Sequence, residues 1–454
     1  MAKEIKIALL MAVSLFMEML DGTIVTTALP KISQSYHTSS ATTALIVSVY
    51  LITSAIFIPL SGWMANRFGK KKIWIIAVII FTASSLANAL TPNFSLLVLF
   101  RIIQGISGAL MTPTARLIVL EKTPASKMLK MISYLIWPAL IAPAIAPVVG
   151  GFIVTYWNWR WIFLINGPIG FIIALIGIKI IDADQADETT SFDILGFVEI
   201  ALSSGIILVS AELATHGKNY WIFAFELFVV GVILGIIVFR HLKTAINPLF
   251  SINALKKVSF RIFQTGGSVF WIGVGALPYI LTFFLQTIFH WPAIKAGTYV
   301  LFIFIGNIGI KPFANQIIRK LRYRSSLLAS FAVVFISSIA LAFIQSDTVP
   351  VIIMFLSFSA GVGRSLALTA YNGLCFSEIS PQDRNSANTL NSVTSTLAQG
   401  LGISLITVVV NLLQISFSIT TAYKLGFVFL GLLMIFPVIE VLFLPKDIGK
   451  ATIS

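Results

Sequence analysis

The feature of this sequence that most limits its fold is a long series of apolar stretches separated by short polar, glycine- or proline-containing breaks. Each stretch runs for about 17–25 residues, the length at which an α-helix crosses the hydrocarbon core of a bilayer. Hydrophobic residues make up 57% of the 454-residue chain and charged residues only 11%, whereas charged residues make up about 25% of a soluble globular protein. We therefore predict an all-α polytopic membrane protein.

Counting the apolar stretches predicts roughly fourteen transmembrane helices. We place them near residues 6–30, 43–65, 73–91, 95–118, 131–155, 161–181, 195–213, 220–242, 262–289, 296–318, 327–345, 350–375, 390–415 and 424–445. The connections are short, which suits helices that cross the membrane alternately in opposite directions. An even number of helices places both termini on the same side of the membrane.

Lysine and arginine residues indicate the orientation, because cytoplasmic loops of membrane proteins carry an excess of both. One set of alternate loops holds basic clusters, among them Lys70–Lys72 and Arg319–Arg324, whereas the other set holds few basic residues. Both termini are therefore expected in the cytoplasm. This loop pattern accounts for the net charge of +14, so no nucleic-acid partner is expected.

Two weakly similar halves are visible in the sequence. The basic loop Gly62–Lys72 closes the second predicted helix, and a related basic segment, Asn315–Arg324, closes the tenth. Many secondary transporters are built from such repeats. We predict an N-terminal six-helix bundle in residues 1–184, two additional helices with linkers in residues 185–260, and a C-terminal six-helix bundle in residues 261–454.

The first predicted helix contains two acidic residues. Asp21 lies in the apolar run Leu20–Pro30, and Glu18 lies one helical turn before it. A charged side chain at the centre of a bilayer costs roughly 2.5–3.5 kcal/mol on insertion scales, so an acid at this depth indicates an ion or substrate pathway.

Four blocks of sequence carry motifs of a known transporter family. Leu20–Pro30 reads L-D-x-T-I-V-x-x-A-L-P, Gly62–Lys72 is a glycine-bounded basic loop, Arg101–Ala109 contains R-x-x-Q-G, and Pro143–Gly151 contains P-x-x-x-P-x-x-G-G. On these motifs the chain resembles the fourteen-helix drug:proton antiporter group of the major facilitator superfamily. The resemblance implies two six-helix bundles with two extra central helices. It also implies proton-coupled export of small amphipathic compounds or drugs, by alternating access, across a bacterial inner membrane.

The resemblance makes Asp21 the leading candidate for proton coupling. A carboxylate in a poorly solvated cavity gains proton affinity and can load and release a proton as access alternates. The alternative is that Asp21 is a structural acid, hydrogen-bonded to a threonine or asparagine of a neighbouring helix. Glu18 has no counterpart in the family pattern, so it is a second proton site, a cavity-lining acid or a local peculiarity.

The other blocks supply candidate gating residues. In the basic loop the candidates are Gly62, Asn66, Arg67 and Gly69. Asn66 stands where the family has an aspartate, which puts a gating role of the loop in doubt. The alternative is that the basic residues only hold this loop on the cytoplasmic side. In the fourth predicted helix, Arg101 is expected to tune a nearby acid or to contact substrate, and Gln104 and Gly105 complete its motif. In the fifth, Pro143 and Pro147 are expected to bend the helix, with Gly150 and Gly151 at its close contacts.

Five further polar residues are candidates for lining a substrate cavity: Gln286, Asn307, Lys311, Arg364 and Asn372. Arg364 is a mid-membrane cation that is expected to bind an anionic substrate, to neutralise Asp21, or to form an ordinary ion pair within the membrane. Lys311 lies nearer the cytoplasmic end, where its side chain is able to snorkel toward the interface.

Other classes of function fit the sequence less well. The four histidines fall in or beside loops without metal-ligand spacing, and no phosphate-binding loop is present. We therefore expect no enzyme activity, no cofactor and no metal site. The expected partners are a small-molecule substrate, protons and the lipid bilayer, and the protein is expected to be a monomer. An exporter of an anionic metabolite, such as a siderophore or a metal-citrate complex, remains the alternative to a drug exporter.

Overall fold

The computed structural model describes residues 3–38, 40–121, 123, 127–182, 184, 191–445 and 447–449, and its regular structure over these residues is entirely helical. The helices of the first half are α1 (Lys3–Tyr36), α2 (Ser40–Phe68), α3 (Lys70–Leu90), α4 (Phe94–Glu121), α5 (Met128–Tyr156), α6 (Trp161–Leu164) and α7 (Asn166–Ile180). Two helices follow, α8 (Ile194–Thr215) and α9 (Lys218–Thr244). The second half contains α10 (Val258–Thr287), α11 (Ala293–Gly309), α12 (Lys311–Leu341), α13 (Pro350–Cys375), α14 (Arg384–Leu413), α15 (Ile419–Leu433) and α16 (Ile435–Leu442), with short 3₁₀ turns at Asn253–Lys256 and Pro381–Asp383.

Within the described residues, 12 helical segments are long and apolar enough to cross a membrane. Helices suit this setting because their backbone hydrogen bonds are satisfied within the segment. Apolar side chains also cover the outside of the protein; in α9, for example, Ile222 is 77% exposed and Phe225 67% exposed. This surface suits contact with lipid, and the prediction of an all-helical, multi-pass membrane protein is confirmed.

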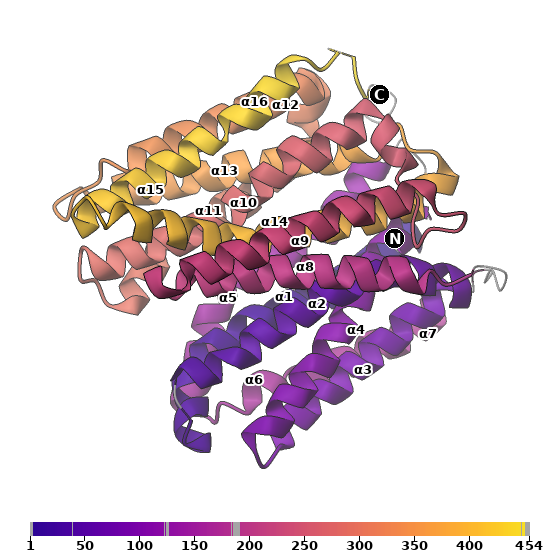
Figure 1. Ribbon diagram of the computed structural model, residues 1–454, viewed down its shortest axis with the longest axis horizontal. Coiled ribbons are helices and arrows are strands. Elements are labelled where there is room, and N and C mark those ends of the chain that lie inside the picture. Colours follow the sequence, from indigo (N-terminus) through magenta and orange to yellow (C-terminus); the bar gives the residue numbers. More distant parts are fainter. Residues whose placement is uncertain are drawn as a thin grey trace.

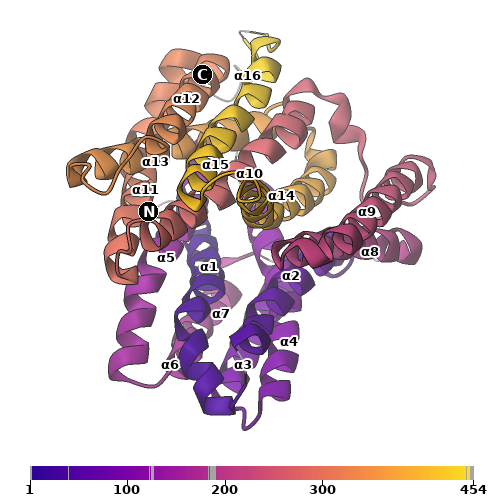
Figure 2. The same ribbon diagram turned by 60° about the vertical axis from the view of Figure 1, so that its left-hand side comes forward.

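The helices form two groups with a pair between them. In Figure 1 the indigo-to-purple helices α1–α7 lie below and the pink-to-yellow helices α10–α16 lie above. The pair α8–α9 lies to one side of both groups, where α8 packs against α2 and α14 (Figure 2). Helix α1 begins and α16 ends at the same end of the molecule, on the right in Figure 1. We call this the terminal end and the opposite one the far end.

The two groups repeat one packing pattern. In the first, α1 packs on α5, α2 on α4, and α3 on both α4 and α7. In the second, α10 packs on α14, α11 on α13, and α12 on both α13 and α15. This correspondence pairs α1, α3, α4 and α7 with α10, α12, α13 and α15, and it extends the weak similarity between the two basic segments of the sequence.

The two basic segments are mostly helical, and the prediction of a basic loop between the helices there is wrong. Helix α2 continues to Phe68 and α3 begins at Lys70, so only Gly69, with φ of 88°, separates them. In the second half Arg322, with φ of 65° and ψ of 168°, interrupts α12 in the same way. Glycine reaches a positive φ without steric cost whereas arginine does not. The helices therefore include the basic residues, and the chain changes direction at one residue in each segment, Gly69 in the first and Arg322 in the second.

The predicted tenth helix, 296–318, is also divided. Helix α11 ends at Gly309, and a new helix begins at Lys311 with Pro312 in its first turn. Proline lacks the backbone N–H that a continuous helix would use there. The break sets Asn307 and Lys311 on either side of a discontinuity. The boundary predicted after residue 184 falls next to residues 185–190, which lie outside the described residues.

Candidate functional site

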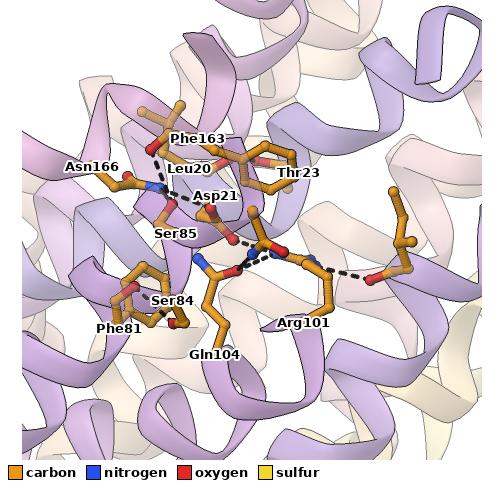
Figure 3. A network of polar contacts seen from close by, with 12 residues as sticks. Leu20, Asp21, Thr23, Phe81, Ser84, Ser85, Arg101, Gln104, Phe163 and Asn166 are labelled. Carbon is orange, nitrogen blue, oxygen red and sulfur yellow. Dashed lines mark hydrogen bonds and ion pairs between the residues drawn. The ribbon is translucent and has the colours of Figure 1, made fainter. Parts of the chain in front are cut away.

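Asp21 and Arg101 form an ion pair in the interior of the first helix group. Arg101 Nη1 donates to Asp21 Oδ2 at 2.6 Å, and both side chains are fully buried (Figure 3). Asp21 comes from α1 and Arg101 from α4. Two opposite charges removed from water stabilise each other only when their geometry is good and their remaining hydrogen-bonding atoms are satisfied.

Neighbouring polar groups satisfy most of those atoms. Asn166 Nδ2, at the start of α7, donates to Asp21 Oδ1 at 2.8 Å and to Ser85 Oγ of α3 at 2.9 Å. Arg101 Nη1 also donates to Gln104 Oε1 at 2.8 Å. Asn88 Nδ2 donates to the same Gln104 oxygen at 3.0 Å. One connected network, visible in Figure 3, therefore joins α1, α3, α4 and α7.

Helix α2 completes the surroundings of Arg101. Arg101 Nε donates to the Ile46 carbonyl at 2.9 Å, and the guanidinium lies 4.3 Å from the centre of the Tyr50 ring. Gly105 makes this approach possible, because a Cβ there would lie 2.8 Å from the Tyr50 carbonyl oxygen. Arg101 was expected either to tune a nearby acid or to contact substrate, and the structure places it beside the acid Asp21. Its side chain is 0% exposed, so it offers no surface to a substrate in this conformation.

Glu18 occupies a separate polar position one turn away. It is 7% exposed and accepts a hydrogen bond from Thr112 of α4. Its carboxylate also lies against Gly108 and close to the Tyr50 hydroxyl, since a Cβ at position 108 would be 3.2 Å from each. Tyr50 therefore lies between the two acids of α1, with its ring on Arg101 and its hydroxyl toward Glu18.

The fifth-helix motif supports α1 beside the network. Gly150 of α5 faces Thr27 and Ile24, and a Cβ at position 150 would lie 2.8 Å from Ile24 Cγ1. A Cβ at position 151, in contrast, would have no neighbour within 4 Å among the described residues, so packing does not require glycine there. Pro143 and Pro147 both fall within α5, and the side chain of Pro147 is outside the described part of the chain.

Gly69 and its neighbours form a local structure at the terminal end. Asp184 accepts hydrogen bonds from the backbone N–H groups of Lys70, at 2.5 Å, and Lys71, at 3.2 Å. A carboxylate at a helix N-terminus satisfies free N–H groups and complements the helix dipole. The Lys70 ammonium pairs with Glu121 at 3.1 Å. These contacts tie the start of α3 to the ends of α4 and α7.

Gly62 joins the two helix groups. Asn385 Nδ2, in the first turn of α14, donates to the Gly62 carbonyl at 2.9 Å. A Cβ at position 62 would collide with Thr389 Oγ1, so glycine allows α2 and α14 to approach. Asn66 and Arg67, in the last turn of α2, are half-buried.

Two more bonds link α14 to the first half at the same end. Asn388 Nδ2 donates to the Pro113 carbonyl at 2.9 Å, and Arg384 Nη1 donates to the Leu120 carbonyl at 3.1 Å. Both acceptors belong to α4. We call the three bonds made by Arg384, Asn385 and Asn388 the α14 latch. The donors are two neutral amides and an arginine, and all three acceptors are backbone carbonyls.

The candidate cavity residues of the second half do not gather into one site. Lys311 Nζ donates to Thr369 Oγ1 at 2.9 Å and is 7% exposed, so the expectation that it snorkels is wrong. Asn372 Nδ2 donates within its own helix to the Leu368 carbonyl at 2.7 Å. Gln286 is half-buried near the C-terminal end of α10.

Arg364 is buried within the second half. The ion-pair partner of Asp21 is Arg101 and not Arg364, which corrects the expectation that Arg364 neutralises Asp21. No ion pair involves Arg364 within the described residues, so the ordinary membrane ion pair is also not formed there.

Several network members were not identified from the sequence. Asn166 is a polar residue in the apolar helix α7, Ser85 and Asn88 are two of several small polar residues in α3, and Tyr50 is an aromatic residue of a kind that packs in any core. For Asn166, Ser85 and Asn88, the sequence signal that could have identified them was their polarity at membrane depth. Their convergence on Asp21 depends on how four helices pack.

Comparison with known proteins identifies the family. The profile of the Major Facilitator Superfamily matches residues 11–403. A protein of Pectobacterium atrosepticum named "Putative multidrug resistance protein MdtD" is 31% identical over 404 residues, covering 87% of this chain and 85% of the relative. A protein of the same name from Escherichia coli O6:H1 is 29% identical over 399 residues, covering 87% and 84%.

Solved structures share the fold at low sequence identity. The human organic anion transporter MFSD10 (TETRAN) aligns with a TM-score of 0.71 and 12% identity, over 97% of this chain and 100% of that one. The proton:xylose symporter XylE aligns with a TM-score of 0.66 and 14% identity, over 98% and 97%. Members of the matched family are secondary transporters of small molecules and not enzymes. The sequence motifs, the repeated helix packing and these matches together establish that this chain belongs to the Major Facilitator Superfamily.

Proposed function

We propose that this transporter is a proton-coupled antiporter that exports small amphipathic compounds or drugs, with Asp21 as the residue that carries the proton. The observation that carries the proposal is the buried Asp21–Arg101 pair, at 2.6 Å, joined to a network from α1, α3, α4 and α7. Protonation of Asp21 removes one charge of this pair and weakens its hold on Arg101. Gain or loss of one proton therefore changes contacts among four helices at once.

The orientation of the protein follows from its charges. The basic residues Lys70–Lys72 and Arg319–Arg324 lie around the reversals at Gly69 and Arg322, and basic residues favour the cytoplasm. We place the terminal end in the cytoplasm of a bacterium, with the protein in the inner membrane. We propose that α5, of 29 residues, and the shorter apolar helix α11 cross the membrane in addition to the 12 described spans, for a total of fourteen crossings.

The division into domains follows the repeated packing. Residues 1–184 and 261–454 make the two bundles, and residues 185–260 contain the lateral pair α8–α9. The α14 latch closes the terminal end between the bundles, supported by apolar contacts of Ile58, Ala109 and Val393. Alternating access requires this latch to open when the protein exposes its binding site to the cytoplasm.

The alkylation rate of Cys375, the only cysteine of the chain, reports whether the α14 latch opens. Cys375 is fully buried in a cluster that combines residues of α13 with Leu120 and Met128 of the first half. In the double variant Asn385→Ala/Asn388→Ala we expect alkylation of Cys375 by N-ethylmaleimide to become about tenfold faster, because each hydrogen bond contributes about 0.5–1.5 kcal/mol. The rate is measured by mass spectrometry on protein in proteoliposomes.

A control variant in the same helix distinguishes the loss of the latch hydrogen bonds from a general destabilisation of α14. Thr407 of α14 donates only within its own helix, to the Ile403 carbonyl at 2.8 Å. Thr407→Ala should leave the alkylation rate unchanged. Equal rates for wild type and the double variant would show that these bonds do not hold the terminal end closed.

The direct test of the function is transport in everted membrane vesicles. An imposed pH gradient should drive uptake of a cationic dye, and addition of the dye should move protons in the opposite direction, as reported by a pH-sensitive fluorophore. Transport that persists unchanged when the proton gradient is collapsed, with the membrane potential clamped, would refute proton coupling.

An anionic substrate is the second candidate, and a stripe of polar residues favours it. Asn307, Lys311 and Asn315 recur at four-residue intervals, and Asn315 accepts a hydrogen bond from Ser133 of α5 at 3.3 Å. Lys311 has no carboxylate partner and Asn307 has no hydrogen-bond partner for either amide atom, among the described residues. In the same vesicles, metal-citrate and siderophore complexes should then be transported in preference to cationic dyes, and Lys311→Gln should abolish that preference.

A further inference from the structure

A small cavity lies inside the second half of the molecule, between α10, α12, α13 and α15. Its lining includes Arg364 together with Gly273, Val274, Val334 and Ser338. Arg364 is 5% exposed, and its Nε and Nη1 atoms have no hydrogen-bond partner among the described residues. The cavity is therefore apolar over most of its surface but carries unsatisfied N–H donors.

This arrangement leaves a positive charge without compensation. Arginine stays protonated in proteins, so Arg364 is a cation in this cavity. A buried charge needs a counter-charge and hydrogen bonds to offset the loss of its hydration. Glu440 of α16, the acid beside α10, accepts a hydrogen bond from Thr265 at 2.7 Å and forms no ion pair with Arg364.

The corresponding helices of the first half show what is missing. There the Arg101 guanidinium of α4 contacts Asp21 of α1, Gln104 of its own helix and Tyr50 of α2, and Asp21 supplies the negative charge. In the second half the corresponding helices α10, α12, α13 and α15 surround Arg364, and α10 contributes Gly273 and Val274 to the cavity. Neither residue carries a charge, so Arg364 lacks the counter-charge that Asp21 gives Arg101.

We propose that this cavity is an anion-binding site, in which Arg364 and the Ser338 hydroxyl bind a small monoanionic group. The cavity has a volume of about 10 Å³, which is room for about one water-sized molecule, and a halide ion and formate, the smallest carboxylate, share this chemistry. Both accept hydrogen bonds from a guanidinium and a hydroxyl, and both neutralise the buried charge. The site is separate from Asp21 and holds whether or not the transported compound is itself anionic.

The test measures thermal stability as a function of the anion present. Purified full-length protein in detergent is held in sodium isethionate, a larger sulfonate salt, and chloride, bromide or formate is introduced at constant ionic strength. A ligand that binds only the folded state raises stability with its concentration. We expect a saturable rise of about 3 °C or more in the Tm read by tryptophan fluorescence. A response to halides alone identifies an inorganic ion, and a stronger response to formate identifies a carboxylate group.

Three variants decide whether the response comes from this cavity. Arg364→Gln should show no anion-dependent shift, whereas Arg116→Gln, which removes a half-buried arginine of α4 that does not line the cavity, should respond as wild type does. Val274→Asp places a carboxylate on α10 in the cavity, so it should keep a high Tm and lose the response. An absent shift in wild type, or an equal shift in Arg364→Gln, would overturn the proposal. If Val274→Asp does not fold, the contrast between the two arginine variants still decides it.

Discussion

Asp21→Asn is expected to lower uphill transport in everted vesicles at least about tenfold, a value within the range of coupling free energies of about 1–3 kcal/mol. Asparagine has nearly the shape of aspartate and still accepts a hydrogen bond from Arg101, but it cannot bind or release a proton. The variant should therefore bind substrate and equilibrate it down its own gradient, while substrate addition no longer moves protons.

Two comparisons make this result specific. Glu4→Gln removes a half-buried acid of the same helix, which pairs with Lys127 at 3.3 Å, and should leave coupling intact. Glu18→Gln tests the second acid, whose hydrogen bond from Thr112 places it outside the Arg101 network. Wild-type accumulation by Asp21→Asn against a gradient would show that the proton is carried elsewhere.

Arg101→Gln should destabilise the protein by about 3–5 kcal/mol, because it leaves the Asp21 carboxylate buried without its cation. The substitution also removes the donor to the Ile46 carbonyl and weakens the bridge to Gln104. A large drop in the Tm of the purified protein should follow, together with loss of transport.

The double variant Asp21→Asn/Arg101→Gln distinguishes a charge effect from lost packing. Removing both charges should recover most of the lost stability, because no unpaired ion then remains in the interior. Transport coupling should stay absent. If the double variant is as unstable as Arg101→Gln alone, the arginine acts mainly through packing against Tyr50 and Phe163, and the ion pair contributes little. Asp21→Asn also leaves a buried ion, Arg101, without its partner, so a loss of stability is expected there too, and the proton-carrying role of Asp21 is read from coupling and not from stability.

The fold was largely predictable because its main signal is local. Each predicted apolar stretch overlaps one or two helices, with several ends a few residues beyond them, since length and hydropathy belong to the stretch itself. The reversals were harder to predict. Gly69 has a sequence signal, whereas Arg322 has a conformation that arginine adopts rarely, and the basic residues on either side read equally well as loop or helix.

The candidate site was predictable only in part. Asp21, Arg101 and Gln104 stood out because charge and amide groups are costly in an apolar helix. Their mutual contact did not follow, because Asp21 and Arg101 are 80 residues apart in the sequence. For Arg364 the sequence left three roles open, and the structure removed two of them by showing which charges are near one another.

The sequence by itself determined that this chain is a helical membrane protein and which residues carry the cost of polarity at membrane depth, because both properties depend on composition within single segments. Only the tertiary structure decided how those residues are paired. It placed Asp21, Arg101 and Asn166 in one network, held α14 against α2 and α4 at the terminal end, and left Arg364 in its cavity without a counter-charge. Such pairings arise from close approaches of helices distant in the chain, which side-chain size at positions such as Gly62, Gly105 and Gly150 permits.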